Sequence, residues 1–328
     1  MRFDRLIPVA ALMSLNLAPG FVFADEQATQ AVGLLEHARQ IQNVTAENGV
    51  PFALNGQLTF RSGSKAVEGW YKLVWKSPIE WREDLDLGGI HRTRVGAEGG
   101  YRQIRGGDYQ PLAFFDFDRM ASPYALLNLG THERLEKVKE QKIQGARLSC
   151  VETVDKSERA RELCFDAANG VLVHAKAFGM AIDYSQFATL QGKSIPLRAK
   201  LDSKLCTMEL SLQLVNKPWH AAPDLFTIGD AAEFWGLCDN PTDAEIVDRV
   251  APNYPANVRA AHRGGIVFVY VVIEKDGSVS HVRVAQGVFP ALDREAADAV
   301  SRWRYRPRTC DGIPIRTETI IEIIFSVS

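Results

Sequence analysis

The chain has 328 residues, a net charge of −2 at pH 7 and 46% hydrophobic residues. At roughly 100–200 residues per domain, this length predicts two domains. The hydrophobic content is that of an ordinary globular protein. A nearly neutral chain without a long basic block argues against nucleic acid as a partner.

The first 24 residues have the pattern of a secretory signal. Arg2 and Arg5 form a short basic region, and residues 6–17 form an apolar core. A helix end is predicted at Pro19-Gly20, and residues 22–24 provide a small-residue cleavage site. We predict cleavage before Asp25. The alternative is an uncleaved membrane anchor, because the apolar stretch approaches the length that spans a bilayer.

An exported chain meets an oxidising compartment, so its five cysteines can form disulfides. Cys150 and Cys164 flank a predicted hairpin, and a bridge between them would stabilise the fold by about 3 kcal/mol. A second bridge can join Cys238 to Cys310, which leaves Cys206 in a buried strand. Other pairings and a chain of free thiols both stay open. We expect no metal site, since no Cys-x-x-Cys or paired-histidine spacing occurs.

Short strands follow an N-terminal helix. Residues 27–49 begin with an amphipathic helix in which Val32, Leu35 and Ile41 share one stripe. The strands are expected at residues 54–61, 69–75, 80–85, 92–95, 100–104, 148–153, 171–177, 180–187 and 199–215, with an insertion at 112–130. Such close spacing predicts an antiparallel sheet that curls.

Three tryptophans lie within the first strands of this series. On adjacent strands, Trp70, Trp75 and Trp81 would line one face. Either they pack in the core, or they line an apolar pocket for an acyl chain or another apolar ligand. Acidic residues near them are interpreted as a solvated sheet edge: Glu80, Glu83, Asp84 and Asp86.

A family resemblance rests on short motifs in these strands. The motifs are Leu58-Thr59-Phe60, Gly69-Trp70-Tyr71-Lys72-Leu73, Trp75, Pro78 and Trp81-Arg82-Glu83. With them, residues 27–228 resemble the periplasmic carriers of outer-membrane lipoproteins. The resemblance implies a half-barrel covered by helices, with an apolar cavity for acyl chains.

The last quarter of the chain has its own pattern of elements. Residues 265–273 form a strand that is apolar on both faces, and Asp276-Gly277 is typical of a hairpin turn. A return strand, a helix from Leu292 to Trp303 ended by Pro307, and a strand at 318–325 follow. We predict a three-stranded antiparallel sheet with two helices on one face.

The final strand is the expected binding element. Because nothing follows it in the chain, it is the best candidate for a free sheet edge. An exposed edge accepts an extended peptide through backbone hydrogen bonds. The predicted partner-binding residues are Thr319, Ile320, Ile321, Glu322, Ile323, Ile324 and Phe325.

A second resemblance covers this quarter of the chain. It rests on Pro252, Tyr254, Pro255, Arg259, Gly265, Val267, Val269, Asp276-Gly277, Val279, Val284, Leu292-Asp293, Ala296-Ala297, Ala299-Val300, Trp303, Arg306-Pro307, Gly312, Pro314 and Ile315. This set is similar to the TonB C-terminal domain family. The resemblance implies a periplasmic domain that binds a peptide of an outer-membrane transporter by strand addition, linked to energised transport.

We therefore expect an α+β protein in four parts. These are a signal peptide (1–24), a curled antiparallel half-barrel with helices (25–229), a linker (230–247) and a three-stranded sheet with two helices of the TonB C-terminal type (248–328). The expected partner is an outer-membrane transporter peptide or another periplasmic protein. The alternative is a periplasmic carrier of lipid or lipoprotein with a TonB-like docking domain.

The expected location is the periplasm. Membrane association is expected only through partners or through an uncleaved N-terminus. No Gly-x-Ser-x-Gly, His-Glu-x-x-His or phosphate-binding loop occurs in the sequence. We therefore expect neither an enzyme nor a cofactor.

Overall fold

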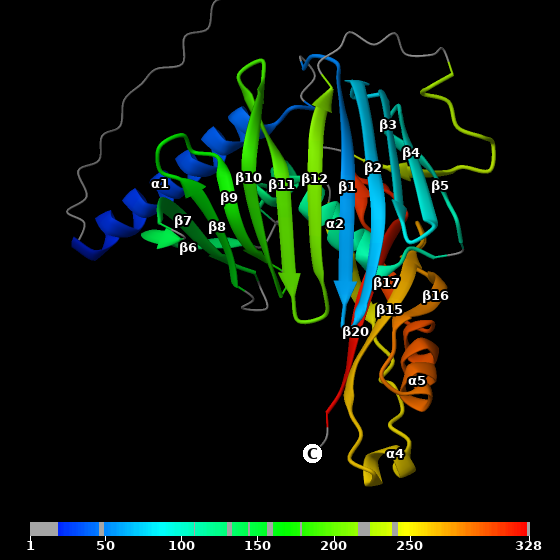
Figure 1. The fold of residues 1–328 in the computed structure, drawn as a ribbon. Coiled ribbons are helices and arrows are strands. Elements are labelled where there is room, and N and C mark those ends of the chain that lie inside the picture. Colours follow the sequence, from blue (N-terminus) through cyan, green and yellow to red (C-terminus); the bar gives the residue numbers. More distant parts are fainter. Residues whose placement is uncertain are drawn as a thin grey trace, which may run out of the picture.

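The computed structural model describes residues 19–45, 49–107, 109–129, 133–143, 145–155, 160–177, 179–215, 224–237 and 242–326, with side chains from residue 27 onward. A large curled sheet makes up most of the described chain, and a smaller C-terminal unit lies at one end of it (Figure 1). The basic region and apolar core of the signal lie outside the described residues, so the signal peptide stays a prediction.

Helix α1 (Pro19–Gln42) includes Pro19 and Gly20, which are the first described residues. The helix that was predicted to end there lies outside the described residues, so its end stays a prediction. The stripe that packs on the sheet contains Ala31, Leu35 and Ala38, whereas Val32 is exposed. Within the described residues, no helix has the length and hydrophobicity needed to cross a bilayer.

The large sheet is antiparallel and open. Its strands are β1 (Phe52–Ser62), β2 (Lys65–Ser77), β3 (Glu80–Leu87), β4 (Ile90–Ala97), β5 (Gly100–Arg105), β6 (Arg134–Ile143), β7 (Ala146–Val154), β8 (Ala160–Asp166), β9 (Leu172–Ala177), β10 (Met180–Leu190), β11 (Lys193–Ser203), β12 (Thr207–Val215) and β13 (Glu233–Gly236). They lie in the order β13-β5-β4-β3-β2-β1-β12-β11-β10-β9-β8-β7-β6. The predicted curled antiparallel sheet is confirmed, and β13 and β6 form its two edges.

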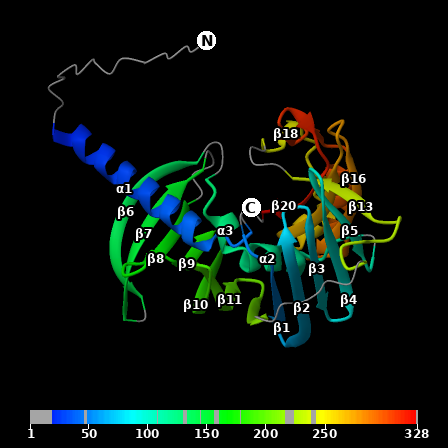
Figure 2. The ribbon, with the colours of Figure 1, turned by 90° about the horizontal axis from the view of Figure 1, so that it is seen from above.

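Helices occupy the hollow of this sheet (Figure 2). They are α1, α2 (Leu112–Ala121) and α3 (Pro123–Leu126), the last two inside the predicted insertion. Phe114, Phe117 and Met120 of α2 are buried in one cluster with Leu58 of β1 and Leu85 of β3. The large sheet and its helices therefore share one main apolar core, and two smaller buried clusters lie elsewhere on the sheet.

Two parts of the large sheet differ from the prediction. Residues 199–215 form parts of two strands, because the chain turns between β11 and β12. Cys206 lies in that turn and not in a strand, although it is buried. Strand β6 was not predicted, since its charged sequence lacks the apolar alternation of a strand. Lys137 and Lys139 of β6 form ion pairs with Glu152 of β7.

The C-terminal unit contains the predicted three-stranded sheet. Its elements are β14 (Glu245–Asp248), α4 (Ala256–Ala260), β15 (Gly265–Ile273), β16 (Val279–Gln286), α5 (Pro290–Val300), β17 (Arg304–Arg306), β18 (Thr309–Cys310), β19 (Ile313–Pro314) and β20 (Thr317–Phe325). The sheet order is β16-β15-β20, and β14 pairs with β17. Val258 of α4 and Leu292 of α5 join one buried cluster with Val267 of β15, so both helices cover the same face.

The turn at Asp276-Gly277 is present, and the helix after it is shorter than predicted. Gly277 has φ +80°, and a Cβ atom there would lie 1.8 Å from the Tyr305 carbonyl oxygen, so only glycine fits. Helix α5 ends at Val300, and Trp303 lies beyond it with its indole N–H donating to the Val250 carbonyl at 2.8 Å. The helix therefore ends before β17, well ahead of the predicted stop at Pro307.

Candidate functional site

Strand β20 is an edge strand of the small sheet. It pairs with β15 from Gly265 opposite Phe325 to Ile273 opposite Thr317. Within the described residues, no strand pairs with its other edge. The seven predicted partner-binding residues, Thr319 to Phe325, all lie on this strand. The structure thus places the predicted residues at an edge, and whether they bind a partner remains a prediction.

The two faces of β20 have different environments. Ile323 and Phe325 are buried under α4 and α5 in the core of the small unit. Ile320 packs on the opposite face, beside the large sheet. Further along that face, Glu322 is exposed and the side chain of Ile324 is 64% exposed. The strand is therefore covered on both faces near its start and only on one face near its end.

Polar contacts fasten the start of β20 to the large sheet. The Glu318 carboxylate accepts hydrogen bonds from Arg105 Nη1 at 3.1 Å, Gln103 Nε2 at 3.0 Å and the Tyr270 hydroxyl at 3.2 Å. Arg105 and Gln103 belong to β5 of the large sheet, and the Glu318 side chain is 7% exposed. Burial, followed by the Glu318 charge, raises the pKa of Tyr270. The hydroxyl therefore stays protonated and available as a donor.

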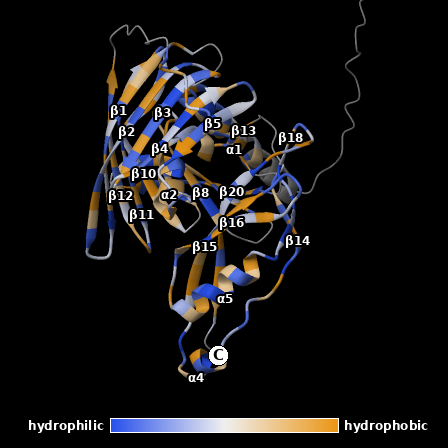
Figure 3. Ribbon diagram, turned by 90° about the vertical axis from the view of Figure 1, so that its right-hand side faces the viewer, coloured by the Kyte–Doolittle hydropathy of each residue, from blue (hydrophilic) through white to orange (hydrophobic). Residues whose placement is uncertain are grey.

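An apolar seam lies beside these contacts. Trp235 of β13 forms a buried cluster with Tyr270 and Val272 of β15. The ring of Tyr270 also contacts the rings of Tyr109 and Phe115, at centroid distances of 6.1 and 6.2 Å. Strand β13 lies within residues 230–247, which were predicted to be a linker. In the structure it pairs with β5 and forms an edge strand of the large sheet. Figure 3 shows the small unit against one end of the large sheet.

An ion network centred on the buried Arg92 continues from the seam into the hollow of the large sheet. Arg92 of β4, 1% exposed, contacts Glu83 at 2.8 Å and Asp118 at 2.6 Å. Arg94 bridges Asp118 at 3.1 Å and Gln103 at 2.7 Å. Burial alone would raise the pKa of Asp118, but the charges and hydrogen bonds of the two arginines outweigh it and the pKa is lowered. A chain of charge-assisted contacts thus runs from α2 to β20.

The acidic residues of β3 do not form a solvated sheet edge, because β3 lies between β2 and β4. The Glu83 side chain is 14% exposed in the hollow, and Asp84 is buried on the other face of the strand. The interpretation of Glu80, Glu83, Asp84 and Asp86 as a solvated edge is wrong for these two. Alternating charges in a strand carry no local signal of which residues they will pair with across the sheet.

The three tryptophans do not share one face. Trp75 lies opposite Trp81 on the neighbouring strand, and its ring stacks on Phe52 at 5.7 Å. Trp70 is five residues earlier on the same strand, which puts it on the opposite face because side chains alternate. Trp75 is 2% exposed and Trp70 is 41% exposed. The expectation that one pocket is lined by all three is therefore wrong in its geometry.

One predicted disulfide is present. Cys150 and Cys164 lie opposite each other on β7 and β8 and are joined by a disulfide. Cys206 is a free thiol, as expected for the cysteine left over, and burial raises its pKa to about 11. Cys310 is in a disulfide. Cys238 lies outside the described residues, so the Cys238–Cys310 bridge stays a prediction.

The C-terminal part of the chain matches a known family model. Residues 250–327 match the family described as Gram-negative bacterial TonB protein C-terminal. The match includes α4, α5, the whole three-stranded sheet and the predicted residues Thr319 to Phe325. The resemblance predicted from the sequence is therefore confirmed for this part. No curated protein matches the chain.

Solved structures resemble the larger part. A LolA superfamily protein from Nitrosomonas europaea is 13% identical with a TM-score of 0.39, over 60% of this chain and 97% of its own. A DUF1329 family protein from Desulfovibrio piger is 10% identical with a TM-score of 0.43, over 61% of this chain and 97% of its own. The structure of the Pseudomonas aeruginosa MucA/MucB complex is 12% identical with a TM-score of 0.24, over 76% of this chain and 82% of the matched chain.

Proposed function

We propose that the chain is a periplasmic protein whose C-terminal unit binds an extended partner peptide by strand addition along β20. The observation that carries the proposal is the position of β20, which pairs with β15 and has no strand on its other side within the described residues. The family match over residues 250–327 supports it. We propose a peptide of an outer-membrane transporter as the partner, and a role in energised transport.

The edge offers both backbone and side-chain contacts. Alternate residues of an edge strand direct their N–H and C=O groups outward, and each hydrogen bond formed there adds about 0.5–1.5 kcal/mol. The exposed Ile324 and its cross-strand neighbour Ile266, 40% exposed, supply apolar surface beside the second half of the edge. A partner peptide with an apolar residue at the matching position would gain affinity from this pair.

The large sheet would serve as a rigid support for the edge strand. We infer a half-barrel that holds Glu318 through Arg105 and Gln103, so that force on a bound peptide reaches the larger unit. The alternative of a lipid carrier has less support, because Phe114, Phe117 and Met120 occupy the hollow that an acyl chain would need. A carrier would have to displace α2.

A peptide titration tests the proposal. The protein that starts at Asp25 is labelled with ¹⁵N and titrated, in an NMR experiment, with peptides from the periplasmic side of outer-membrane transporters. We expect amide shift changes centred on residues 319–325. Glu322→Pro, which removes a backbone donor, is compared with Glu322→Ala, which keeps it. Shift changes confined to the large sheet would favour the carrier. The same conclusion would follow if added fatty acid raises the Tm of the protein while no peptide binds.

The proposed location has its own test. N-terminal sequencing of the protein recovered from a periplasmic extract is expected to begin at Asp25. A sequence that begins at Met1 in the membrane fraction would instead indicate an anchored protein.

A further inference from the structure

A polar pocket lies on the outer face of the large sheet, away from the hollow and from β20. Its volume is about 520 Å³, within the usual range of small-molecule sites. Trp70 of β2 lies among its lining residues and is 41% exposed, whereas Tyr71 beside it in the sequence is buried in the core of the hollow. The indole of Trp70 therefore offers an apolar, electron-rich surface beside polar side chains in this pocket.

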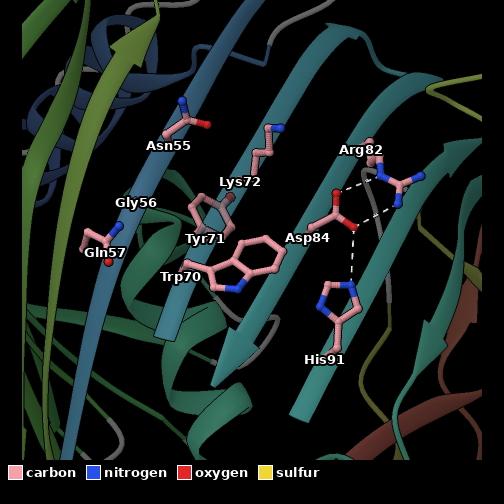
Figure 4. Close-up of a pocket in the computed structure, with 9 residues that line it drawn as sticks. All are labelled: Asn55, Gly56, Gln57, Trp70, Tyr71, Lys72, Arg82, Asp84 and His91. Atoms are coloured by element: carbon pink, nitrogen blue, oxygen red, sulfur yellow. Dashed lines mark hydrogen bonds and ion pairs between the residues drawn. The ribbon is translucent and has the colours of Figure 1, made fainter. Parts of the chain in front are cut away.

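A fixed network forms one side of the pocket (Figure 4). The guanidinium of Arg82 holds the Asp84 carboxylate through bonds of 2.7 and 3.0 Å. The Thr93 hydroxyl donates to Asp84 at 2.7 Å, and His91 Nε2 lies 3.0 Å from that hydroxyl. The rings of His91 and Trp70 lie 5.4 Å apart. This network fixes the orientation of the wall, and the charges of Arg82 and Asp84 offset each other.

The other side of the pocket presents groups that are free to bind. Gln57 lies opposite Trp70 on the neighbouring strand, and Asn55 lies opposite Lys72. Within the described part of the chain, these two amides and the lysine have no side-chain hydrogen bond and no ion pair. Side chains at facing positions of adjacent strands lie about 4.5–5.5 Å apart at Cβ. A ligand above the indole of Trp70 is therefore within reach of two amides and one cation.

This combination selects among ligand classes. An acyl chain would desolvate two amides and an ammonium group without giving them a partner. A quaternary ammonium ion would meet the uncompensated charge of Lys72, and Asp84 is already occupied by Arg82. The C–H face of a pyranose ring complements the negative face of an indole, while its hydroxyls match the donors and acceptors of amides. The free ammonium adds a preference for an anionic substituent.

We propose that Trp70, Gln57, Asn55 and Lys72 form a binding site for an acidic saccharide. The sugar ring stacks on Trp70, its hydroxyls bond to the two amides, and its carboxylate pairs with Lys72. Arg82, Asp84 and His91 position the platform from the other side. This site is independent of β20 and of the peptide proposed to bind there.

Calorimetric titration of the chain tests the site with a panel of acidic trisaccharides built on galacturonate, glucuronate and muramate units. The methyl ester of each serves as a neutral match. We expect binding of at least one acid, and about tenfold weaker binding of its ester. Trp70→Ala is expected to abolish binding of both forms. Lys72→Gln is expected to retain the sugar and remove the preference for the acid.

Phe234→Ala is the control variant, because Phe234 is 44% exposed on β13 and does not line the pocket. It should bind the acid as the unchanged chain does. Circular dichroism will show whether each variant is folded. The proposal is overturned if no member of the panel binds, or if the Trp70→Ala variant binds the acid as tightly as the Phe234→Ala variant does. The nucleotide AMP is titrated as a rival ligand, and the proposal is also overturned if AMP binds at Trp70 more tightly than every sugar.

Discussion

Glu318 of the edge strand and Arg105 of the large sheet form a part-buried ion pair, with Arg105 Nη1 3.1 Å from Glu318 Oε2. The pair joins residues 213 positions apart in the chain. It therefore connects the strand proposed to bind a peptide to the body that would support it.

Removing Glu318 should loosen this junction. Glu318→Ala leaves the part-buried guanidinium of Arg105 without its close partner, and since breaking a fully buried pair costs about 3–5 kcal/mol, this variant should lose up to about 3 kcal/mol. Glu322→Ala is the matched control, since Glu322 lies on the same strand and face but is exposed, and its loss should cost less than about 0.5 kcal/mol. Urea unfolding measures both. Equal effects would contradict a structural role for the pair.

Trp235 should carry much of the apolar contact between the two units. It is 3% exposed in the seam, and truncation of a buried tryptophan to alanine costs about 3–5 kcal/mol. Phe234→Ala, at the next position and 44% exposed, should be close to neutral. We expect Trp235→Ala to separate the thermal unfolding of the small unit from that of the large one. A single transition at the original Tm would show that Trp235 does not couple the units.

How much of this could be predicted from the sequence depends on the range of the signal. The turn at Asp276-Gly277 has a local signal, because only glycine fits it, and the family pattern predicts the whole small unit. The contacts that join β20 to the large sheet have no local signal in the sequence. Nothing near Glu318 indicates that Arg105 is its partner, and nothing in residues 80–86 shows that β3 lies between two strands. Trp70 and Trp75 lie an odd number of positions apart in one strand, so their opposite faces could be predicted from the alternation of side chains.

The ion network in the hollow should make stability depend on acid pH. The folded pKa of Asp118 lies below its ordinary value of 3.8, so its carboxylate stabilises the fold above pH 3.8 and this contribution is lost as pH falls through the folded pKa. Asp118→Asn should therefore cost more stability at pH 7 than near pH 3. Urea unfolding at the two pH values measures the difference.

Asp116, two residues away, should behave in the opposite way. Burial raises its pKa despite Arg119, so the ionised carboxylate costs stability and the cost disappears as pH falls through the raised pKa. Asp116→Asn is expected to be neutral or stabilising at pH 7. If both variants lose the same stability at every pH, the opposite shifts assigned to the two aspartates are wrong.

Thiol titration should resolve the cysteines. With bridges Cys150–Cys164 and Cys238–Cys310, denatured but unreduced protein will expose one reactive thiol, that of Cys206. Three reactive thiols would contradict the second bridge. The double variant Cys150→Ser/Cys164→Ser should lose about 3 kcal/mol of unfolding free energy, because it releases a short closed loop.

Hydrogen exchange along β20 tests the central claim most directly. In the free protein, the amides that point to the open edge should exchange quickly, while those bonded to β15 are protected. Saturation with a transporter peptide should slow exchange at these alternate positions between Thr319 and Phe325. If the outward amides are already protected without peptide, or stay fast when the peptide is bound elsewhere, β20 is not where a partner strand pairs.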